Sequence, residues 1–212
     1  SLKARAEANE AFGAELKNGK KADAQRGYEI ACKEWMDVRS FGQVFAFKGS
    51  DLSLGIRGPV SVQPAFSVDP IDITSMQITK SVNSEDKEGK SSDTMGMKHR
   101  VDFGVYILKG SINVQLSEKT GFTEEDAEKI KEAIRTLFVN DSSSARPDGS
   151  MVMHKLYWWK HNCKIGQYSS HKVHNSIEIK KKEGVRNPRK IEDYEIICHE
   201  LPGLAVEEYE GL

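Results

Sequence analysis

Residues 40–47, with the sequence SFGQVFAF, decide how the fold of this chain is interpreted. Apolar side chains occupy both alternating sets of positions in this stretch, among them Val44, Phe45 and Phe47. A strand that is covered on both faces has this pattern, whereas a half-buried strand alternates strictly between apolar and polar residues. The stretch therefore predicts a central β-strand.

Strand-like patterns continue beyond this stretch as far as Leu116. Apolar and polar residues alternate there in several short runs, which is the pattern of strands with one buried face. Gly110 interrupts the last run and indicates either a bulge or a tight turn. The runs predict strands at 60–63, 76–79, 101–107 and 112–116, and similar patterns predict strands at 151–159, 176–179 and 194–198.

The clearest helix signal begins at Thr123, whose hydroxyl can cap a helix. The acidic residues at 124–126 follow it and place negative charge at the positive end of the helix dipole. Apolar residues then recur at helical spacing up to Leu137. We expect this helix to lie on a sheet, and the order of strands, helix and strands predicts an α+β fold with an antiparallel sheet and helices packed on it.

The rest of the chain divides by composition. Residues 1–36 are rich in Ala, Lys and Glu with sparse apolar positions, which predicts a segment of one or two exposed helices. Residues 37–190 form the predicted sheet domain, and 191–212 are its acidic C-terminal segment. The charged residues 83–97 have little to bury, so we expect them to project as a loop. Because Ser1 replaces an initiator Met, we also expect some N-terminal structure to be missing.

Composition excludes several classes of protein. The chain has 212 residues, 31 Lys and Arg against 32 Asp and Glu, and 38% hydrophobic residues, which is ordinary for a globular domain. No apolar stretch is long enough to cross a membrane, and no secretory leader is visible. Cys32, Cys163 and Cys198 are an odd and widely spaced set, so we expect free thiols, a reducing compartment and a cytoplasmic protein without membrane partners.

The nearly neutral total conceals a segregation of charge along the chain. Residues 154–190 contain ten Lys and Arg against two Glu, which gives +8, whereas 191–212 contain seven acidic residues and no Lys or Arg. A second basic cluster, 98–100, stands where the projecting loop re-enters a strand. Basic residues beside loops and aromatic strands suit a polyanion, because Lys and Arg neutralise phosphates. A solvated charged face remains the alternative.

Candidate chemical groups fit no catalytic or metal-binding pattern. The spacing of His154, His161, Cys163, His171 and His174 matches no common zinc site and includes no CxxC pair. Carboxylates that could hold a metal are available at 37, 69, 72 and 102, but no pair stands in a recognised motif. Phosphate-binding and nucleophile-elbow motifs are also missing from the sequence. We therefore predict no catalytic residues, no metal and no cofactor.

Several ordered motifs carry a family resemblance. They are DVRSFGQV at 37–44, RGPV at 57–60 with SVDP at 67–70, TMGMKH at 94–99 leading to Tyr106, and TGF at 120–122 before the capped helix. In this order and spacing the chain from about Trp35 to Ile179 resembles the Cas-seven backbone subunit of type I-C CRISPR Cascade. Met97 stands where the family usually has arginine, which leaves Lys98 and His99 as the matching basic pair.

The resemblance implies both a fold and a function. The fold would be a modified RNA-recognition-motif, or ferredoxin-like, palm with long inserted loops, of which 83–97 would be a thumb. The function would be to bind CRISPR RNA without catalysis, as copies of the chain assemble head to tail along the guide in an antiviral interference complex. Partners would be other copies, the large subunit, a Cas-five type subunit, and target DNA that pairs with the guide.

We predict eight RNA-binding residues from the charge pattern and the resemblance together. Lys and Arg would contact phosphates in a sequence-independent manner, and Met95 would act as an apolar wedge. The set comprises Arg39, Gln43, Arg57, Lys80, Met95, Lys98, His99 and Arg100.

Two other functions remain open at this point. A CRISPR endoribonuclease, or another metal-dependent nuclease of similar fold, would use a histidine or carboxylate and would cleave RNA. A zinc-stabilised interaction module would contain stoichiometric zinc. The number of copies per complex and the bounds of the thumb are not predictable from the sequence.

Overall fold

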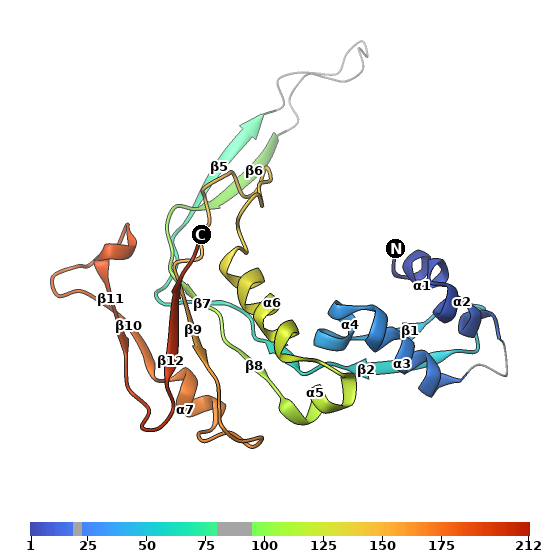
Figure 1. Ribbon diagram of the computed structural model, residues 1–212. Helices are drawn as coiled ribbons and strands as arrows, with labels where there is room; N and C mark the ends of the chain where they lie inside the picture. The colour runs from blue at the N-terminus through green and yellow to red at the C-terminus, as the bar shows by residue number, and fades with distance from the viewer. Residues whose placement is uncertain (19–22, 80–94) are drawn as a thin grey trace, which may run out of the picture. The chain divides into compact units, whose positions relative to one another are not determined.

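The computed structural model describes residues 1–18, 23–79 and 95–212 (Figure 1). This part of the chain is a mixture of seven α-helices and small antiparallel sheets, each of two strands. The predicted mixed α+β class is confirmed at this level. The chain divides into two compact units, each described separately below: unit 1 comprises 1–62, 110–174 and 200–212, and unit 2 comprises 63–109 and 175–199.

Unit 1 contains all the α-helices and three strand pairs of the described residues. The pairs are β1 with β2, β3 with β8, and β9 with β12, all antiparallel. Its elements are α1 (Leu2–Ala8), α2 (Glu10–Lys17), α3 (Ala24–Glu34), α4 (Met36–Phe41), β1 (Gly42–Ala46), β2 (Ser53–Arg57), β3 (Val60–Val62), β8 (Gly110–Ile112), α5 (Val114–Thr120), α6 (Glu124–Arg135), β9 (Lys155–Trp159), α7 (Ser170–His174) and β12 (Val206–Glu210).

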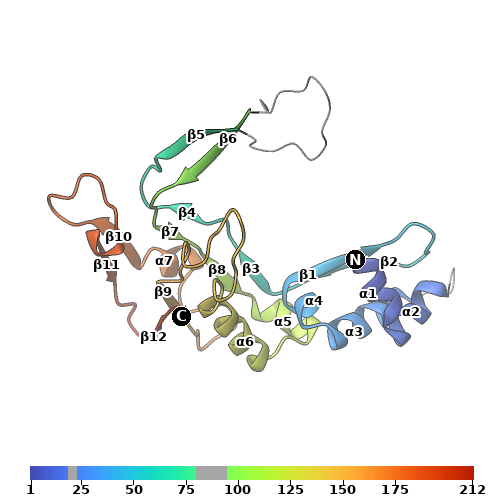
Figure 2. The same cartoon turned by 90° about the horizontal axis from the view of Figure 1, so that it is seen from above.

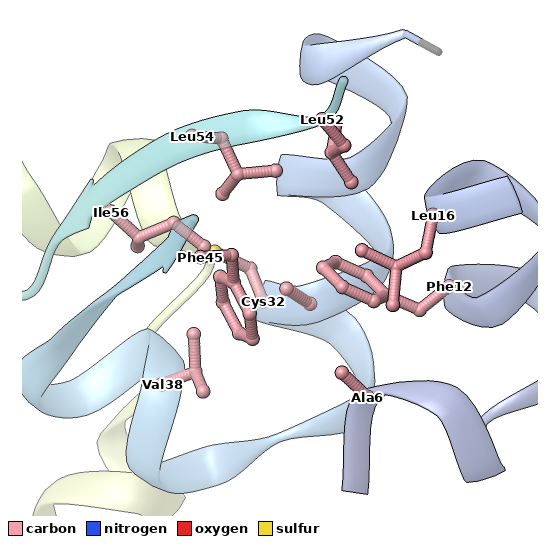
Figure 3. Close-up of a cluster of buried hydrophobic side chains, with 10 residues drawn as sticks. Ala6, Phe12, Leu16, Cys32, Val38, Phe45, Leu52, Leu54 and Ile56 are labelled. Atoms are coloured by element: carbon pink, nitrogen blue, oxygen red, sulfur yellow. The ribbon is translucent and has the colours of Figure 1, made fainter. Parts of the chain in front are cut away.

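The sequence predicts one or two exposed helices in residues 1–36. The structure has three helices, α1 to α3, within this segment, and they build the main core of unit 1. The helices lie along the β1–β2 hairpin (Figure 2) and close its apolar face. An aromatic group is at the centre, with the Phe12 ring 4.8 Å from Phe45 and 5.1 Å from Trp35. Figure 3 shows aliphatic side chains around it, from Leu16 on α2 to Leu54 on β2. Apolar positions in this segment are few, but they converge on one core.

The prediction of a central strand at 40–47 is wrong in two respects. Residues 40 and 41 belong to α4, which ends at Phe41 and is followed by its C-cap Gly42 with φ of +83°. A Cβ at Gly42 would lie 2.2 Å from the carbonyl oxygen of Ile56, so only glycine fits this transition from helix to strand. β1 then pairs with β2 alone among the described strands; Phe45 is buried, whereas Val44 is 64% exposed.

The predicted helix after Thr123 is confirmed as α6. The Thr123 hydroxyl accepts a hydrogen bond from the Asp126 N–H, and the Asp126 carboxylate accepts one from the Thr123 N–H, which completes a capping box. The predicted strand at 112–116 is wrong beyond Ile112. Asn113 caps the start of a short helix there, α5, which ends at Thr120 and is followed by its C-cap Gly121 in the left-handed conformation.

α6 packs beside β9, as predicted for a helix on a sheet, and Lys131 of α6 contacts both strands of the β9–β12 pair. The Lys131 ammonium donates to Glu128 at 2.9 Å and to Glu207 at 2.8 Å. It also lies 5.1 Å from the centre of the Trp158 ring and 5.4 Å from that of Tyr209. Burial alone would lower the pKa of Lys131, but the two carboxylates outweigh burial and raise it.

The described residues of unit 2 form three antiparallel strand pairs. The longest is the β5–β6 ribbon, which projects from the short β4–β7 pair (Figure 2), and the third pair is β10 with β11. Its elements are β4 (Phe66–Ser67), β5 (Ile73–Thr79), β6 (Met95–Val101), β7 (Tyr106–Ile107), β10 (Ile177–Lys181), a 3-10 turn at Ile191–Asp193, and β11 (Tyr194–Cys198).

The strand predictions in unit 2 are partly confirmed. β11 has the predicted bounds 194–198, and β10 covers most of the predicted 176–179. The predicted strand at 101–107 is wrong, because β6 ends at Val101 and β7 begins only at Tyr106. The predicted loop at 83–97 is wrong at its end, where 95–97 are strand residues, and its remaining positions fall outside the described residues.

Candidate nucleic-acid interface

The β5–β6 ribbon carries four of the eight predicted RNA-binding residues, and its register distributes them over two faces. Cross-strand partners share a face, because side chains alternate along each strand. Lys98 is opposite Met76 and Arg100 is opposite Thr74, so these two cations lie on one face. His99 lies on the other face, together with Val101, Met97 and Met95 and their partners Ile73, Gln77 and Thr79.

Both faces of this ribbon are largely uncovered. Met95 is 65% exposed, and large apolar side chains on either face are exposed by 40% or more. A two-stranded ribbon is at best marginally stable in water without a surface to cover it. Exposed apolar residues interleaved with cations are therefore suited to a partner that has both flat apolar parts and negative charge.

The basic residues of the ribbon differ in how free they are to bind a ligand. Arg100 donates its Nε–H to Asp102 at 2.7 Å, and Thr74 donates its hydroxyl to the same carboxylate at 2.7 Å. The Thr74 hydrogen bond and the Arg100 guanidinium lower the pKa of Asp102. The Oγ of Ser75 is 2.8 Å from Nδ1 of His99. Lys98 is exposed and makes no ion pair with a described residue.

A cluster around Asp69 fixes the base of the ribbon. Tyr194 on β11 donates its hydroxyl to Asp69 at 2.7 Å, and the Lys181 ammonium on β10 is 3.1 Å from the same carboxylate. The ring of Phe103, which follows β6, lies 6.5 Å from that of Tyr194. Burial and the hydrogen bond to Asp69 raise the pKa of Tyr194 to about 12. The sequence reasoning missed Tyr194, and no local pattern marks its partner 125 residues away.

Arg39 is engaged within unit 1. Its Nε and one terminal nitrogen donate to the Asp126 carboxylate at 2.8 and 2.6 Å, in the two-pronged geometry that suits guanidinium and carboxylate. The Asp126 side chain is only 1% exposed. The Arg39 guanidinium, followed by the capping hydrogen bond from the Thr123 backbone, lowers the pKa of Asp126. An RNA phosphate at Arg39 would have to compete with this carboxylate.

The other two described candidates lie on the β1–β2 hairpin of unit 1. Gln43 accepts a hydrogen bond at its Oε1 from the N–H of Val44 at 2.9 Å. Arg57 ends β2 opposite Gly42, is exposed, and makes no ion pair among the described residues. The backbone next to it is tightly packed, since a Cβ at Gly58 would lie 2.2 Å from the carbonyl oxygen of Ser40. Lys80 lies outside the described residues.

Two of the histidines in the 154–174 group make local hydrogen bonds. Nδ1 of His161 accepts the N–H of Gln167 at 3.0 Å, and Nε2 of His174 donates to the carbonyl oxygen of Gly110 at 3.0 Å. Within 1–18, 23–79 and 95–212, no three His, Cys, Asp or Glu residues are grouped so as to hold a metal. Cys32 and Cys163 are free thiols, the first buried and the second exposed.

No helix in the described ranges has the length and hydropathy to cross a lipid bilayer.

Comparisons with known proteins identify the family. The family model described as CRISPR-associated protein Cas7 matches residues 2–199, which is nearly the whole chain. This chain belongs to the Cas7 family. The resemblance recognised from its motifs is therefore confirmed at the level of the family.

Structural similarity extends over a smaller part of the chain. A solved structure described as "CRISPR RNA-guided surveillance complex, pre-nicking" is similar over 62% of this chain, with 20% sequence identity and a TM-score of 0.39. The similar region covers 36% of that chain, so the present chain corresponds to about a third of its length. A comparison with curated proteins gives no match.

Proposed function

We propose that this chain is a non-catalytic backbone subunit that binds CRISPR RNA in an interference complex of type I-C. Membership of the Cas7 family over residues 2–199 is the observation that carries the proposal. In this proposal the chain has an RNA-recognition-motif-like palm, and further copies, a large subunit, a Cas-five type subunit and target DNA are its partners. The activity would reside in the cytoplasm.

The β5–β6 ribbon supports this function through the kind of contact it can make. A scaffold for guides of any sequence must bind phosphates and ribose and leave base edges free for the target, and the same logic is known for a different RNA-guided effector. Lys98 and Arg100 share one face and can contact phosphates, whereas Met95 and Met97 project from the other and can contact base faces. The ribbon would form the described part of the thumb.

The proposal also ranks the predicted contacts. Lys98 and Arg57 have no carboxylate partner among the described residues, so each can bind a phosphate without breaking an ion pair. Arg100 shares its charge with Asp102, and Arg39 is bound by buried Asp126. We expect the two unpaired cations to contribute most to RNA affinity, with Arg39 acting by holding the fold.

Salt-dependent RNA binding tests this ranking. For Lys98→Ala and Arg57→Ala, affinity should fall equally for unrelated RNA sequences, and the slope of log K against log salt should decrease in magnitude by about 0.7 per contact. Lys48→Ala and Lys119→Ala remove exposed, unpaired cations outside the predicted set and are the matched controls, with unchanged slopes expected. Labelled RNA should remain intact with and without Mg²⁺; cleavage by the purified chain would instead establish a nuclease.

A further inference from the structure

Half of the ten cations in residues 154–190 are paired with acidic residues once the chain is folded. Strand pairing brings acidic residues of the C-terminal segment opposite basic ones, on β12 against β9 and on β11 against β10. Other lysines of this stretch pair with α5, α6 or the loop after β4. The pairs are Lys155 with Glu208 and Glu210, Lys160 with Glu124, Lys164 with Glu118, Lys180 with Glu195, and Lys181 with Asp69.

The charge that remains is concentrated in one place. Lys172 lies over the ring of Tyr168, at 4.5 Å from its centre. The other four cations, Lys182, Arg186, Arg189 and Lys190, are exposed and make no ion pair among the described residues. All four lie in the connection between β10 and β11, residues 182–190, which we call the basic loop. Its single acidic residue is Glu183, so the loop carries a net charge of +3.

Hydrogen bonds hold the basic loop in a defined conformation. The Asp193 carboxylate accepts the backbone N–H groups of Arg189 at 2.7 Å and Lys190 at 3.2 Å, and these bonds lower the pKa of Asp193. The Lys182 N–H donates to the carbonyl oxygen of Asp193 at 2.9 Å. Gly184, with φ of +81°, allows the turn at the tip. A loop that is already ordered loses less conformational entropy when it binds a ligand.

The basic loop belongs to the same unit as the β5–β6 ribbon and lies near its base. The charge of Arg189 contributes to the lowered pKa of Asp102, the residue that pairs with Arg100. Tyr194 and Lys181, at the root of the basic loop, both bind Asp69 at the start of the ribbon. Unit 2 therefore presents two separate sets of cations, one on the ribbon and one on this loop.

We propose that the basic loop is a second binding surface for a nucleic-acid backbone, distinct from the contacts predicted on the ribbon. Its chemistry fits phosphodiesters: guanidinium groups can bind phosphate oxygens in pairs, and lysines add point charges. Residues 182–190 include no aromatic side chain, so the loop cannot stack on bases. The contact is sequence-independent, and either the guide RNA or the DNA that it meets can supply the phosphates.

A matched pair of quadruple variants tests this surface. One combines K182A, R186A, R189A and K190A. The control, K17A with K33A, K48A and K119A, removes the same charge from exposed lysines of unit 1 that make no ion pair with any described residue. The probes are a guide RNA, and a duplex DNA matching the guide, offered to the chain alone and with guide bound. Circular dichroism checks that both variants keep the folded spectrum.

The expected result is a loss confined to the loop variant. Four lost phosphate contacts should reduce the magnitude of the salt slope by about 3 and weaken binding on the order of 10- to 100-fold, with the control unchanged. A loss with RNA assigns the loop to the guide, and a loss with DNA alone assigns it to the target. Unchanged slopes in both arms, or an equal loss in the control, overturn the proposal.

The proposal for the basic loop rests on the proposed function only for the identity of the ligand. The loop proposal and the proposed function can therefore fail separately. If the unaltered chain binds guide RNA and the loop variant binds RNA and DNA equally well, the loop proposal alone fails. If the unaltered chain binds duplex DNA through the loop but does not retain guide RNA, the backbone-subunit function fails and the loop remains. Binding of neither probe by the unaltered chain overturns both.

Discussion

Asp126 is the residue on which the junction between α4 and α6 depends. Its buried carboxylate accepts two hydrogen bonds from Arg39 and one from the Thr123 backbone. Asp126→Asn would remove the charge and leave the Arg39 guanidinium without its counter-ion, which costs about 3 kcal/mol when the pair is largely buried. We expect unfolding in urea at neutral pH to show a loss of this size.

The pH dependence of that loss provides its own control. The pKa of Asp126 is lowered in the folded state, so its contribution to stability is complete above the ordinary carboxyl value of 3.8 and is lost as the pH falls through the lowered pKa. The difference between unaltered chain and variant should therefore shrink on acidification. Glu125→Gln removes a neighbouring exposed carboxylate and should cost no more than about 0.5 kcal/mol. An equal cost for both variants would contradict the structural role of Asp126.

At the scale of elements, Tyr194 links the β10–β11 hairpin to the base of the ribbon. Tyr194→Phe keeps the ring but removes the hydroxyl that donates to Asp69, whose carboxylate then keeps only Lys181 as a partner among the described residues, and we expect this to cost about 1–2 kcal/mol. Because this bond connects two strand pairs of unit 2, amide hydrogen exchange should accelerate in β5, β6, β10 and β11. Tyr168→Phe removes a hydroxyl that donates to Pro202 at 2.8 Å in unit 1 and is the matched control. Faster exchange in unit 2 with that control would contradict the assignment.

Elements with local signals were predictable from the sequence. α6 has a capping residue, an acidic first turn and an apolar stripe, and its beginning is as predicted. α5 was missed because Ile112, Val114 and Leu116 alternate as in a strand, although Asn113 and Gly121 were available as capping signals. The prediction of a central strand at 40–47 was wrong because the pattern of an apolar stretch does not reveal which of its faces will be covered in the fold.

The candidate interface was predictable only in part, because contacts between residues that are distant in the sequence decide which cations are available. The sequence placed Lys98, His99 and Arg100 in a strand beside a projecting segment, and the alternation of side chains explains why His99 faces away from the other two. Ion pairs between distant residues were not predictable, such as Arg39 with Asp126, 87 positions away. Those pairs decide which cations remain for a ligand, and hence they distinguish the basic loop from the rest of the positive stretch.

At the scale of the whole molecule, the charge and exposure of local surfaces determine which partners can bind, more than the net charge of −1 does. Apolar residues on the ribbon, including Ile73, Met76 and Ile78, are exposed and offer a surface that a partner can cover. In the proposed function, RNA and the next copy of the chain cover this surface. Two different surfaces that join head to tail give an open filament when the rotation from one copy to the next does not close a ring, and the proposed assembly along a guide is of this open kind.

The open filament makes a prediction about assembly on RNA. The number of copies bound should increase in steps as the RNA is lengthened, because each copy occupies the same length of backbone. Mass photometry of complexes on RNAs of increasing length would show masses separated by one chain, 23.7 kDa. M76S with I78S alters apolar positions of the ribbon and should weaken assembly, whereas V44S with V62S, at exposed sites of unit 1, is the control. A single fixed mass at every RNA length would show a closed oligomer and contradict the head-to-tail arrangement.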